Sequence, residues 1–161
     1  MPQPRSGCIF PNIIMSKIFI GIHLVFATRY RKRTINMNRR RELYAYIYSI
    51  LQERGCKTYR INGIGDHLHI AFSLNPLISL SDLVRDLKRS TSLFLNSEKG
   101  FPGFEGWSKG YFATSFSYEE RDAVISYIID QEKHHLGKHL QAEMEWLALK
   151  AGLQFHQEDM K

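Results

Sequence analysis

The chain contains little cysteine and no long hydrophobic run. Only two cysteines, Cys8 and Cys56, occur in its 161 residues, and no CxxC spacing is present. This excludes a zinc finger ligated by cysteines, argues against a disulfide scaffold, and leads us to expect a reducing, cytoplasmic environment. The most apolar stretch, Ile18–Ala27, contains His23 and is shorter than the ~18–20 residues that a membrane span needs, so no membrane association is expected.

Basic and aromatic residues, by contrast, are plentiful. Lysine and arginine total 22 against 16 acidic residues, which gives a net charge of +6, and the chain also has eight tyrosines and ten phenylalanines. A small basic domain rich in aromatic residues suggests a polyanionic partner such as nucleic acid. A basic surface that only aids solubility explains the composition equally well.

The sequence pattern divides the chain into three parts. Residues 1–14 hold three prolines and are expected to form an unstructured leader, followed by one domain over residues 15–137 and a helical extension over residues 138–161. Alternation of apolar residues predicts strands at Lys17–Thr28, Lys57–Ile64, His67–Leu74 and Tyr111–Phe116. Helical spacing and capping residues predict helices at Asn38–Gly55, from Ser79 or Ser81 to Asn96, Ser117–His135 and Leu140–Ala151. This order predicts an α+β, ferredoxin-like (RRM-like) fold, in which helices cover one face of an antiparallel sheet and an extra helix follows at the C-terminus.

Two histidines lie in the third predicted strand. Because side chains alternate along a strand, His67 and His69 leave the same face of the sheet and Leu68 leaves the other. Two neutral imidazoles at this spacing can hold one divalent metal ion, although two solvated polar residues give the same pattern. His23 is expected near this face as a neighbour rather than a ligand, and Asp66 is either a turn residue or a hydrogen-bond partner of His67.

The helix predicted over Ser117–His135 carries a tyrosine and a glutamine four residues apart. The expected buried side of this helix consists of Val124, Ile125, Ile128 and Ile129. Tyr127 and Gln131 lie about 40° from one another around the helix axis, and both flank the buried side. Tyr127 could therefore present its hydroxyl to a cleft, or it could be a half-buried tyrosine at the boundary of the core.

These residues together define a possible reaction on DNA. A metal ion on His67 and His69 could polarise a phosphodiester, and the carboxamide oxygen of Gln131 could supply a third ligand. Such a mixed nitrogen and oxygen set suits Mg²⁺ or Mn²⁺ beside a phosphate. The Tyr127 oxygen would attack the phosphorus and leave a phosphotyrosine and a free 3′-hydroxyl. The exchange needs no ATP, and the sequence has no P-loop.

Several motifs, in this order and spacing, resemble the single-tyrosine HUH transposases, the enzymes of the smallest bacterial insertion sequences. The resemblance covers most of Met15–His135, and its motifs are HLVFATRYRKR, GDHLHIAF, WSKGYF and YIIDQEKHH. It implies that His67, His69 and Gln131 bind the metal ion and that Tyr127 is the nucleophile. It also implies a homodimer, in which the tyrosine helix of one subunit completes the metal site of the other.

The resemblance further implies binding to hairpin DNA and cleavage and joining of single strands at the ends of a mobile element. Basic residues at the end of the first strand and on the second helix are the expected DNA contacts, namely Arg29, Arg31, Lys32, Arg33, Arg85, Lys88 and Arg89. A solvated basic face is the alternative for the helix residues. The tail after Gly137 has no place in the family core, and its helix could modulate the dimer or pack on the surface.

Two other functions remain open at this point. One is an HUH nickase of the replication-initiator or relaxase type, which uses the same histidine pair. The other is a non-catalytic RRM-like module that binds nucleic acid. That module would need aromatic residues on its central strands, where this chain has HLHIAF.

Overall fold

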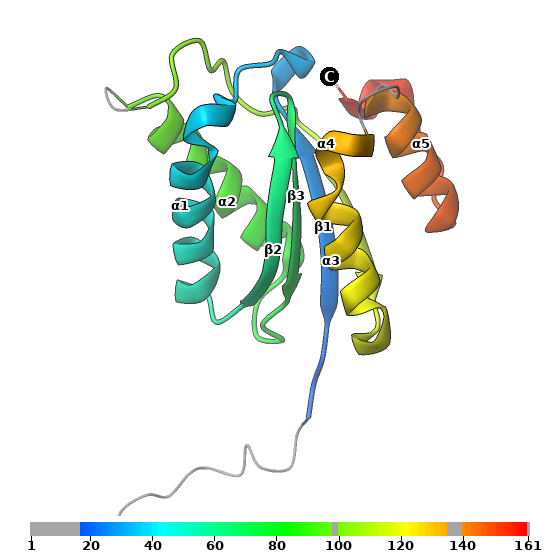
Figure 1. The fold of residues 1–161 in the computed structure, drawn as a ribbon. Coiled ribbons are helices and arrows are strands. Elements are labelled where there is room, and N and C mark those ends of the chain that lie inside the picture. Colours follow the sequence, from blue (N-terminus) through cyan, green and yellow to red (C-terminus); the bar gives the residue numbers. More distant parts are fainter. Residues whose placement is uncertain (1–16, 98–99, 135–139, 161) are drawn as a thin grey trace, which may run out of the picture.

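The computed structural model describes residues 17–97, 100–134 and 140–160. The predicted leader and His135, the predicted end of the tyrosine helix, lie outside these residues. The described strands form one antiparallel sheet with the order β2-β3-β1-β4 (Figure 1). They are β1 (Gly21–Ala27), β2 (Lys57–Ile64), β3 (His67–Ser73) and β4 (Phe112–Phe116). This order, with helices between β1 and β2 and between β3 and β4, confirms the ferredoxin-like fold class.

Two helices cover one face of the sheet, as predicted. They are α1 (Arg40–Glu53), after which Gly55 turns the chain with a positive φ of 70°, and α2 (Leu80–Leu95), which Ser79 caps. Their apolar stripes pack on the strand residues of that face to form the main core. Its fully buried members include Leu24, Leu68, Ile70, Phe72, Leu43, Ile47, Leu51 and Leu87.

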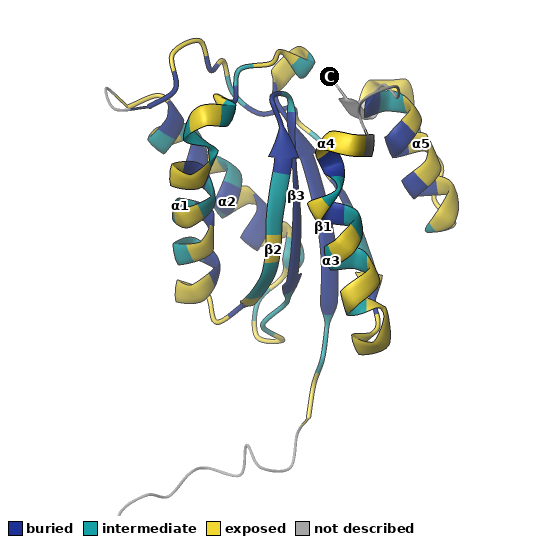
Figure 2. Ribbon diagram, viewed as in Figure 1, coloured by how far each residue is buried: buried dark blue, intermediate teal, exposed yellow. Residues whose placement is uncertain are grey.

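The opposite face of the sheet is also covered, which the sequence analysis did not predict. Ala71 of β3 packs with Ile128 of α3 (Arg121–Ile129), and Val25 of β1 packs with Met144 of α5 (Leu140–Lys150). Figure 2 accordingly shows β1 and most of β3 as buried. Helices α3 and α5 thus lie over the histidine-bearing face of the sheet (Figure 1). Among the described residues, no helix is long and apolar enough to span a bilayer.

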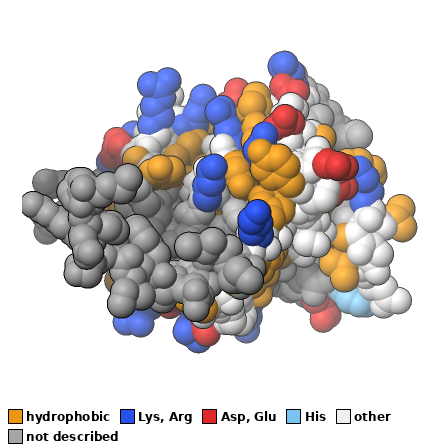
Figure 3. Space-filling model, turned by 90° about the horizontal axis from the view of Figure 1, so that it is seen from below, with side chains coloured by type: hydrophobic (Ala, Val, Ile, Leu, Met, Phe, Trp, Pro, Cys, Tyr) orange, Lys and Arg blue, Asp and Glu red, His pale blue; other side chains and the backbone are white. Residues whose placement is uncertain are grey.

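The first strand is shorter than predicted. It begins at Gly21 rather than Lys17 because Gly21 already pairs with the last residues of both neighbouring strands, Ser73 and Phe116. Phe19, just before it, instead joins an aromatic cluster with Tyr59, Phe116 and Tyr118. The view onto this end of the molecule shows hydrophobic side chains beside lysine and arginine side chains (Figure 3).

The predicted helix Ser117–His135 is broken into segments. The capping box of Ser117 and Glu120 is present, but the α-helix proper, α3, ends at Ile129 and a short α4 (Gln131–His134) follows the kink at Asp130. The amide nitrogen of Asn62 on β2 donates to the carbonyl oxygens of Ile128 (2.9 Å) and Ile129 (3.2 Å), which accounts for the interruption. Ile129, expected on the buried side, is 45% exposed as a result.

Candidate active site

The two strand histidines form the floor of the site. His67 and His69 have no exposed surface and lie on the same face of β3, while Leu68 packs into the main core on the other face. Their ring centres are 5.1 Å apart. The predicted geometry of the pair is therefore confirmed, and it follows from the alternation of side chains along a strand.

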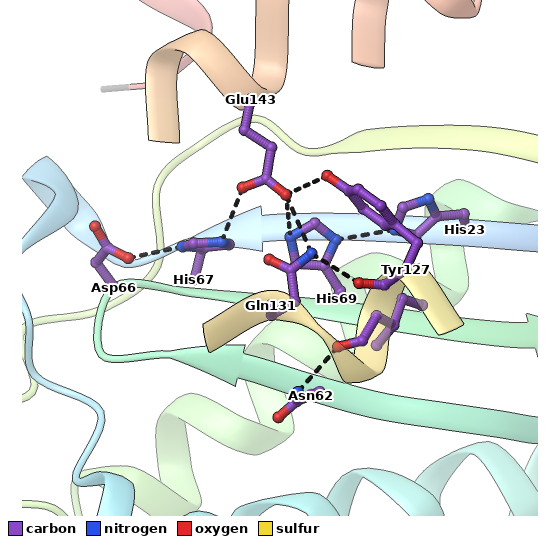
Figure 4. Close-up of polar contacts among 9 residues, drawn as sticks. His23, Asn62, Asp66, His67, His69, Tyr127, Gln131 and Glu143 are labelled. Carbon is purple, nitrogen blue, oxygen red and sulfur yellow. Dashed lines mark hydrogen bonds and ion pairs between the residues drawn. The ribbon is translucent and has the colours of Figure 1, made fainter. Parts of the chain in front are cut away.

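Each histidine is oriented by a neighbour behind it. The Oδ1 atom of Asp66 lies 2.7 Å from Nδ1 of His67, and Nε2 of His23 lies 2.9 Å from Nδ1 of His69. Burial lowers the pKa of His23 to about 4, so this ring is neutral at pH 7. Both contacts engage Nδ1, and the Nε2 atoms of His67 and His69 point together toward α5 (Figure 4). Such partners fix the tautomer and direction of imidazoles that bind metal ions.

A glutamate that the sequence analysis did not identify completes the site. Glu143 of α5 is buried, and its carboxylate faces both histidines: Oε2 is 3.5 Å from Nε2 of His67, and Oε1 is 3.4 Å from Nε2 of His69. Burial opposes the charged form of His67, but hydrogen bonds to the carboxylates of Asp66 and Glu143 outweigh it and raise the pKa of this imidazole. The C-terminal helix, expected to modulate a dimer or to pack on the surface, thus contributes a side chain to the centre of the site.

The tyrosine and the glutamine converge on the same carboxylate. The hydroxyl of Tyr127 donates a hydrogen bond to Oε1 of Glu143, and Nε2 of Gln131 donates to the same oxygen at 3.1 Å (Figure 4). Burial, followed by the hydrogen bond to Glu143, raises the pKa of the Tyr127 phenol above its ordinary value. Gln131 is fully buried, and it contacts Glu143 through its amide nitrogen. All four predicted site residues, His67, His69, Tyr127 and Gln131, therefore meet within one chain.

The donor atoms suit a divalent metal ion. The facing donor atoms of His67, His69 and Glu143 all lie within 4.8 Å of one another. Two ligands that each lie about 2.0–2.2 Å from one ion are separated by roughly 3.0–3.5 Å, and the two nitrogen-to-oxygen distances of 3.4 and 3.5 Å fall in this range. A set of two imidazoles and one carboxylate is one that divalent transition metals accept. These three residues could therefore hold such an ion.

The predicted DNA contacts differ in their surroundings. Arg29, Lys32 and Arg33 are exposed, and Arg33 lies against Gly65 in the turn that precedes Asp66. Lys32 pairs with Glu105 at 2.6 Å. Arg31, partly buried, adopts a positive φ of 55°. The segment Arg29–Arg33 thus lies beside the turn that leads into the histidine strand.

The basic residues of α2 differ in their exposure and contacts, although the sequence predicted that they share one face of the helix. Arg85 and Arg89 are exposed, and Arg85 pairs with Asp82 at 3.0 Å. The Lys88 ammonium instead donates to the carbonyl oxygens of Ser108 (2.9 Å), Lys109 (3.2 Å) and Gly110 (2.7 Å). Lys88 therefore fixes the glycine-rich loop before β4.

One sequence signal could have identified Glu143. The buried positions of α5 are Leu140, Glu143, Met144, Leu147 and Ala148. A carboxylate in the middle of an apolar stripe is costly to bury without a partner, so it marks a polar site beneath the helix. The helix alone could not indicate that this site is the histidine pair, because the contact joins residues 74 or more positions apart in the sequence.

Comparisons with known proteins match this chain to a family and to two solved structures. Residues 17–131 match the family described as "Transposase IS200 like". The transposases for insertion sequence element IS200 of Salmonella typhimurium and Salmonella typhi are each 25% identical over 124 residues, which cover 73% of this chain and 81% of theirs. A candidate transposase from Deinococcus radiodurans R1 has a similar structure, with a TM-score of 0.54, 21% identity, and coverage of 81% of this chain and 98% of that one. A REP-associated tyrosine transposase bound to a REP hairpin matches with a TM-score of 0.56, 13% identity, and coverage of 91% and 92%.

Proposed function

This chain belongs to the IS200-like transposase family, and we propose that it cleaves and rejoins single-stranded DNA at hairpin-bearing element ends through a 5′-phosphotyrosine on Tyr127. One observation carries the proposal. A single buried carboxylate, that of Glu143, accepts the Tyr127 hydroxyl and at the same time faces the Nε2 atoms of His67 and His69. A nucleophile and a candidate metal site therefore adjoin one another.

The proposed step exchanges one phosphodiester for another. The Tyr127 hydroxyl gives its proton to Oε1 of Glu143, and the phenolic oxygen forms a bond to phosphorus while the bond from phosphorus to the 3′-oxygen breaks. The departing 3′-oxygen takes up a proton from water and becomes a free hydroxyl, Glu143 releases the proton of the phenol to water, and the 5′ end stays on Tyr127. The raised pKa of the phenol means that the proton must leave as the bond forms, and a hydrogen-bonded carboxylate is suited to receive it.

The metal ion would be held by His67, His69 and Glu143. Mg²⁺ or Mn²⁺ is the expected ion, and when bound it would supply positive charge that stabilises the phosphate in the transition state. Asp66 and His23 keep the two imidazoles directed at it. Gln131 holds the Glu143 carboxylate through its amide nitrogen, and a rotation of this amide would present its oxygen as a further ligand.

DNA is the proposed partner, and the neighbour solved with a REP hairpin supports this. The exposed side chains Arg29 and Arg33 lie near the turn before Asp66 and would contact phosphates close to the site. Arg31, Lys32, Arg85 and Arg89 are proposed as further contacts, and Lys88 would act through the loop that it holds. A homodimer in which α3 of each subunit lies beside the histidine pair of the other is compatible with the family. Within one chain, Tyr127 also lies close to the histidines.

The alternatives have less support. A replication-initiator or relaxase-type nickase would use the same residues, but the matched family is that of the IS200-like transposases. An RRM-like binding module needs an open sheet face with exposed aromatic residues. In this chain that face carries buried histidines beneath α3 and α5.

Strand cleavage tests the proposal. A pool of single-stranded oligonucleotides, each with a hairpin flanked by randomised unpaired sequence, is incubated with Mn²⁺ and the protein. The wild type should give cleaved strands, of which one end is covalently bound to protein. Tyr127→Phe should abolish both products, whereas Tyr118→Phe, an exposed tyrosine near the start of α3, should retain them. Cleavage that persists in Tyr127→Phe would overturn the proposal.

A further inference from the structure

We infer that a cleft beside Tyr127 is a subsite for one unpaired nucleotide, in which the base stacks on Trp146 and the adjoining phosphate contacts Lys150. The inference rests on the proposed function only in that the bound strand is the one that Tyr127 cleaves. The cleft has a volume of about 410 Å³, within the ~300–1,000 Å³ that is usual for small-ligand pockets. It lies between the sheet, α3 and α5, and its walls include His23, Thr114, Val124, Tyr127, Trp146 and Lys150.

One side of α5 contributes side chains to this cleft. Glu143, Trp146 and Lys150 follow one another at i, i+3 and i+7, which places them on one side of the helix. Glu143 reaches the histidines, and the indole of Trp146 stacks on the ring of Tyr127 with a centre-to-centre distance of 5.8 Å and an angle of 28°. The same helix thus holds the metal-facing carboxylate and an aromatic surface next to the nucleophile.

Trp146 has the properties of a base-stacking residue. It is 46% exposed although it lines a cleft, and the Lys150 ammonium lies 4.6 Å from the centre of its ring. Every nucleobase has a π face, so an exposed indole beside a cation accepts unpaired bases of any sequence. Lys150 is exposed, and it can move from the indole to a phosphate when a base enters.

The cleft also has an acidic residue, and its carboxylate interacts electrostatically with Lys150. Glu120 also lines the cleft, but its Oε2 accepts the Ser117 backbone nitrogen at 2.8 Å, which holds this carboxylate at the start of α3. A phosphate is repelled by that carboxylate and attracted by Lys150. A base on Trp146 would lie beside Tyr127 and therefore adjacent to the linkage that is cut.

DNA binding by variants that are expected not to cleave tests the subsite. All variants carry Tyr127→Phe, which keeps the ring that contacts Trp146, and the probe is a labelled single-stranded DNA 12-mer of mixed sequence. Trp146→Ala should weaken binding roughly 5- to 100-fold, the range of one lost base stack. Trp146→Phe should retain most of the affinity, which also shows that the fold is intact. Lys150→Gln should reduce the slope of log K against log salt by about 0.7, the value for one phosphate contact on a single strand.

Two exposed residues that do not line this cleft provide matched controls. Leu149→Ala removes an apolar side chain of α5 that is 78% exposed and lines no wall of this cleft, and it should leave the affinity unchanged. Lys133→Gln removes an exposed charge of α4 and should leave the salt slope unchanged. If Trp146→Ala binds as tightly as Leu149→Ala, the subsite is wrong, whatever the cleavage assay shows. If Trp146→Ala loses affinity while the wild type forms no phosphotyrosine, the subsite stands and the proposed function falls.

Discussion

Asp66 is expected to influence metal binding without contacting the ion itself. Its carboxylate lies 2.7 Å from Nδ1 of His67 and directs the opposite nitrogen at the site. We predict that Asp66→Ala weakens Mn²⁺ binding about 10- to 100-fold, because the imidazole loses its orienting partner. Titration calorimetry measures this, and Asp122→Ala, at a side chain that is 81% exposed, is the control. An unchanged dissociation constant in Asp66→Ala would contradict the prediction.

Lys88 and Arg89 are neighbours in sequence with different expected roles. Lys88 donates to three loop carbonyls, whereas Arg89 is exposed. Lys88→Met should lower the free energy of unfolding in urea by about 1–3 kcal/mol, since the partly buried hydrogen bonds to the carbonyls of Ser108 and Gly110 are lost. Arg89→Met should leave the urea midpoint unchanged and weaken DNA binding instead. Equal stability of the two variants would show that the three hydrogen bonds of Lys88 contribute little.

At the scale of elements, the kink between α3 and α4 follows Tyr127, the proposed nucleophile. The amide nitrogen of Asn62 on β2 donates to the carbonyl oxygens of Ile128 and Ile129 at the end of α3, the two residues that follow Tyr127. We predict that Asn62→Ala costs about 1–3 kcal/mol of stability and slows cleavage at least roughly tenfold, because the tyrosine is no longer held in place.

Asn75 offers a matched control for Asn62. Its amide nitrogen donates to the carbonyl of Arg54 at 3.0 Å, so it likewise satisfies the end of a helix, but the helix is α1 on the other face of the sheet. Asn75→Ala should lose stability and keep its cleavage rate per folded molecule. The prediction fails if both variants cleave at the same rate after correction for the folded fraction.

Some features of these elements could be predicted from sequence patterns, and others could not. Strand β2 and the start of β3 lie where alternation predicted them, because the turn Gly65–Asp66 and the apolar residues of β3 are local signals. The kink at Asp130 could not be predicted, since its cause is an amide from a strand far away in the sequence. Likewise, the alternation of side chains along a strand was sufficient to predict that His67 and His69 lie together. The place of Glu143 could not be predicted in this way, because it depends on how α5 packs on the sheet.

For the whole molecule, a bound metal ion would join the sheet to the C-terminal helix. His67 and His69 belong to β3 and Glu143 to α5, so binding should stabilise their contact. Mn²⁺ at a hundred times its dissociation constant should raise the free energy of unfolding by about 2.7 kcal/mol and slow hydrogen exchange in α5. Glu143→Gln keeps the shape of the side chain, but it should lose much of this gain. If Mn²⁺ stabilises Glu143→Gln as strongly as the wild type, Glu143 is not a ligand.

Tyr127 is the residue that we propose to form the covalent bond to DNA. The most direct measurement is tandem mass spectrometry of the protein after reaction with hairpin-bearing single-stranded DNA and Mn²⁺, followed by nuclease and protease digestion. We expect a nucleotide phosphate on the peptide that contains Tyr127, with the added mass on that tyrosine. Cleaved strands whose covalent attachment maps to any other residue, or that form with no attachment to protein, would contradict it.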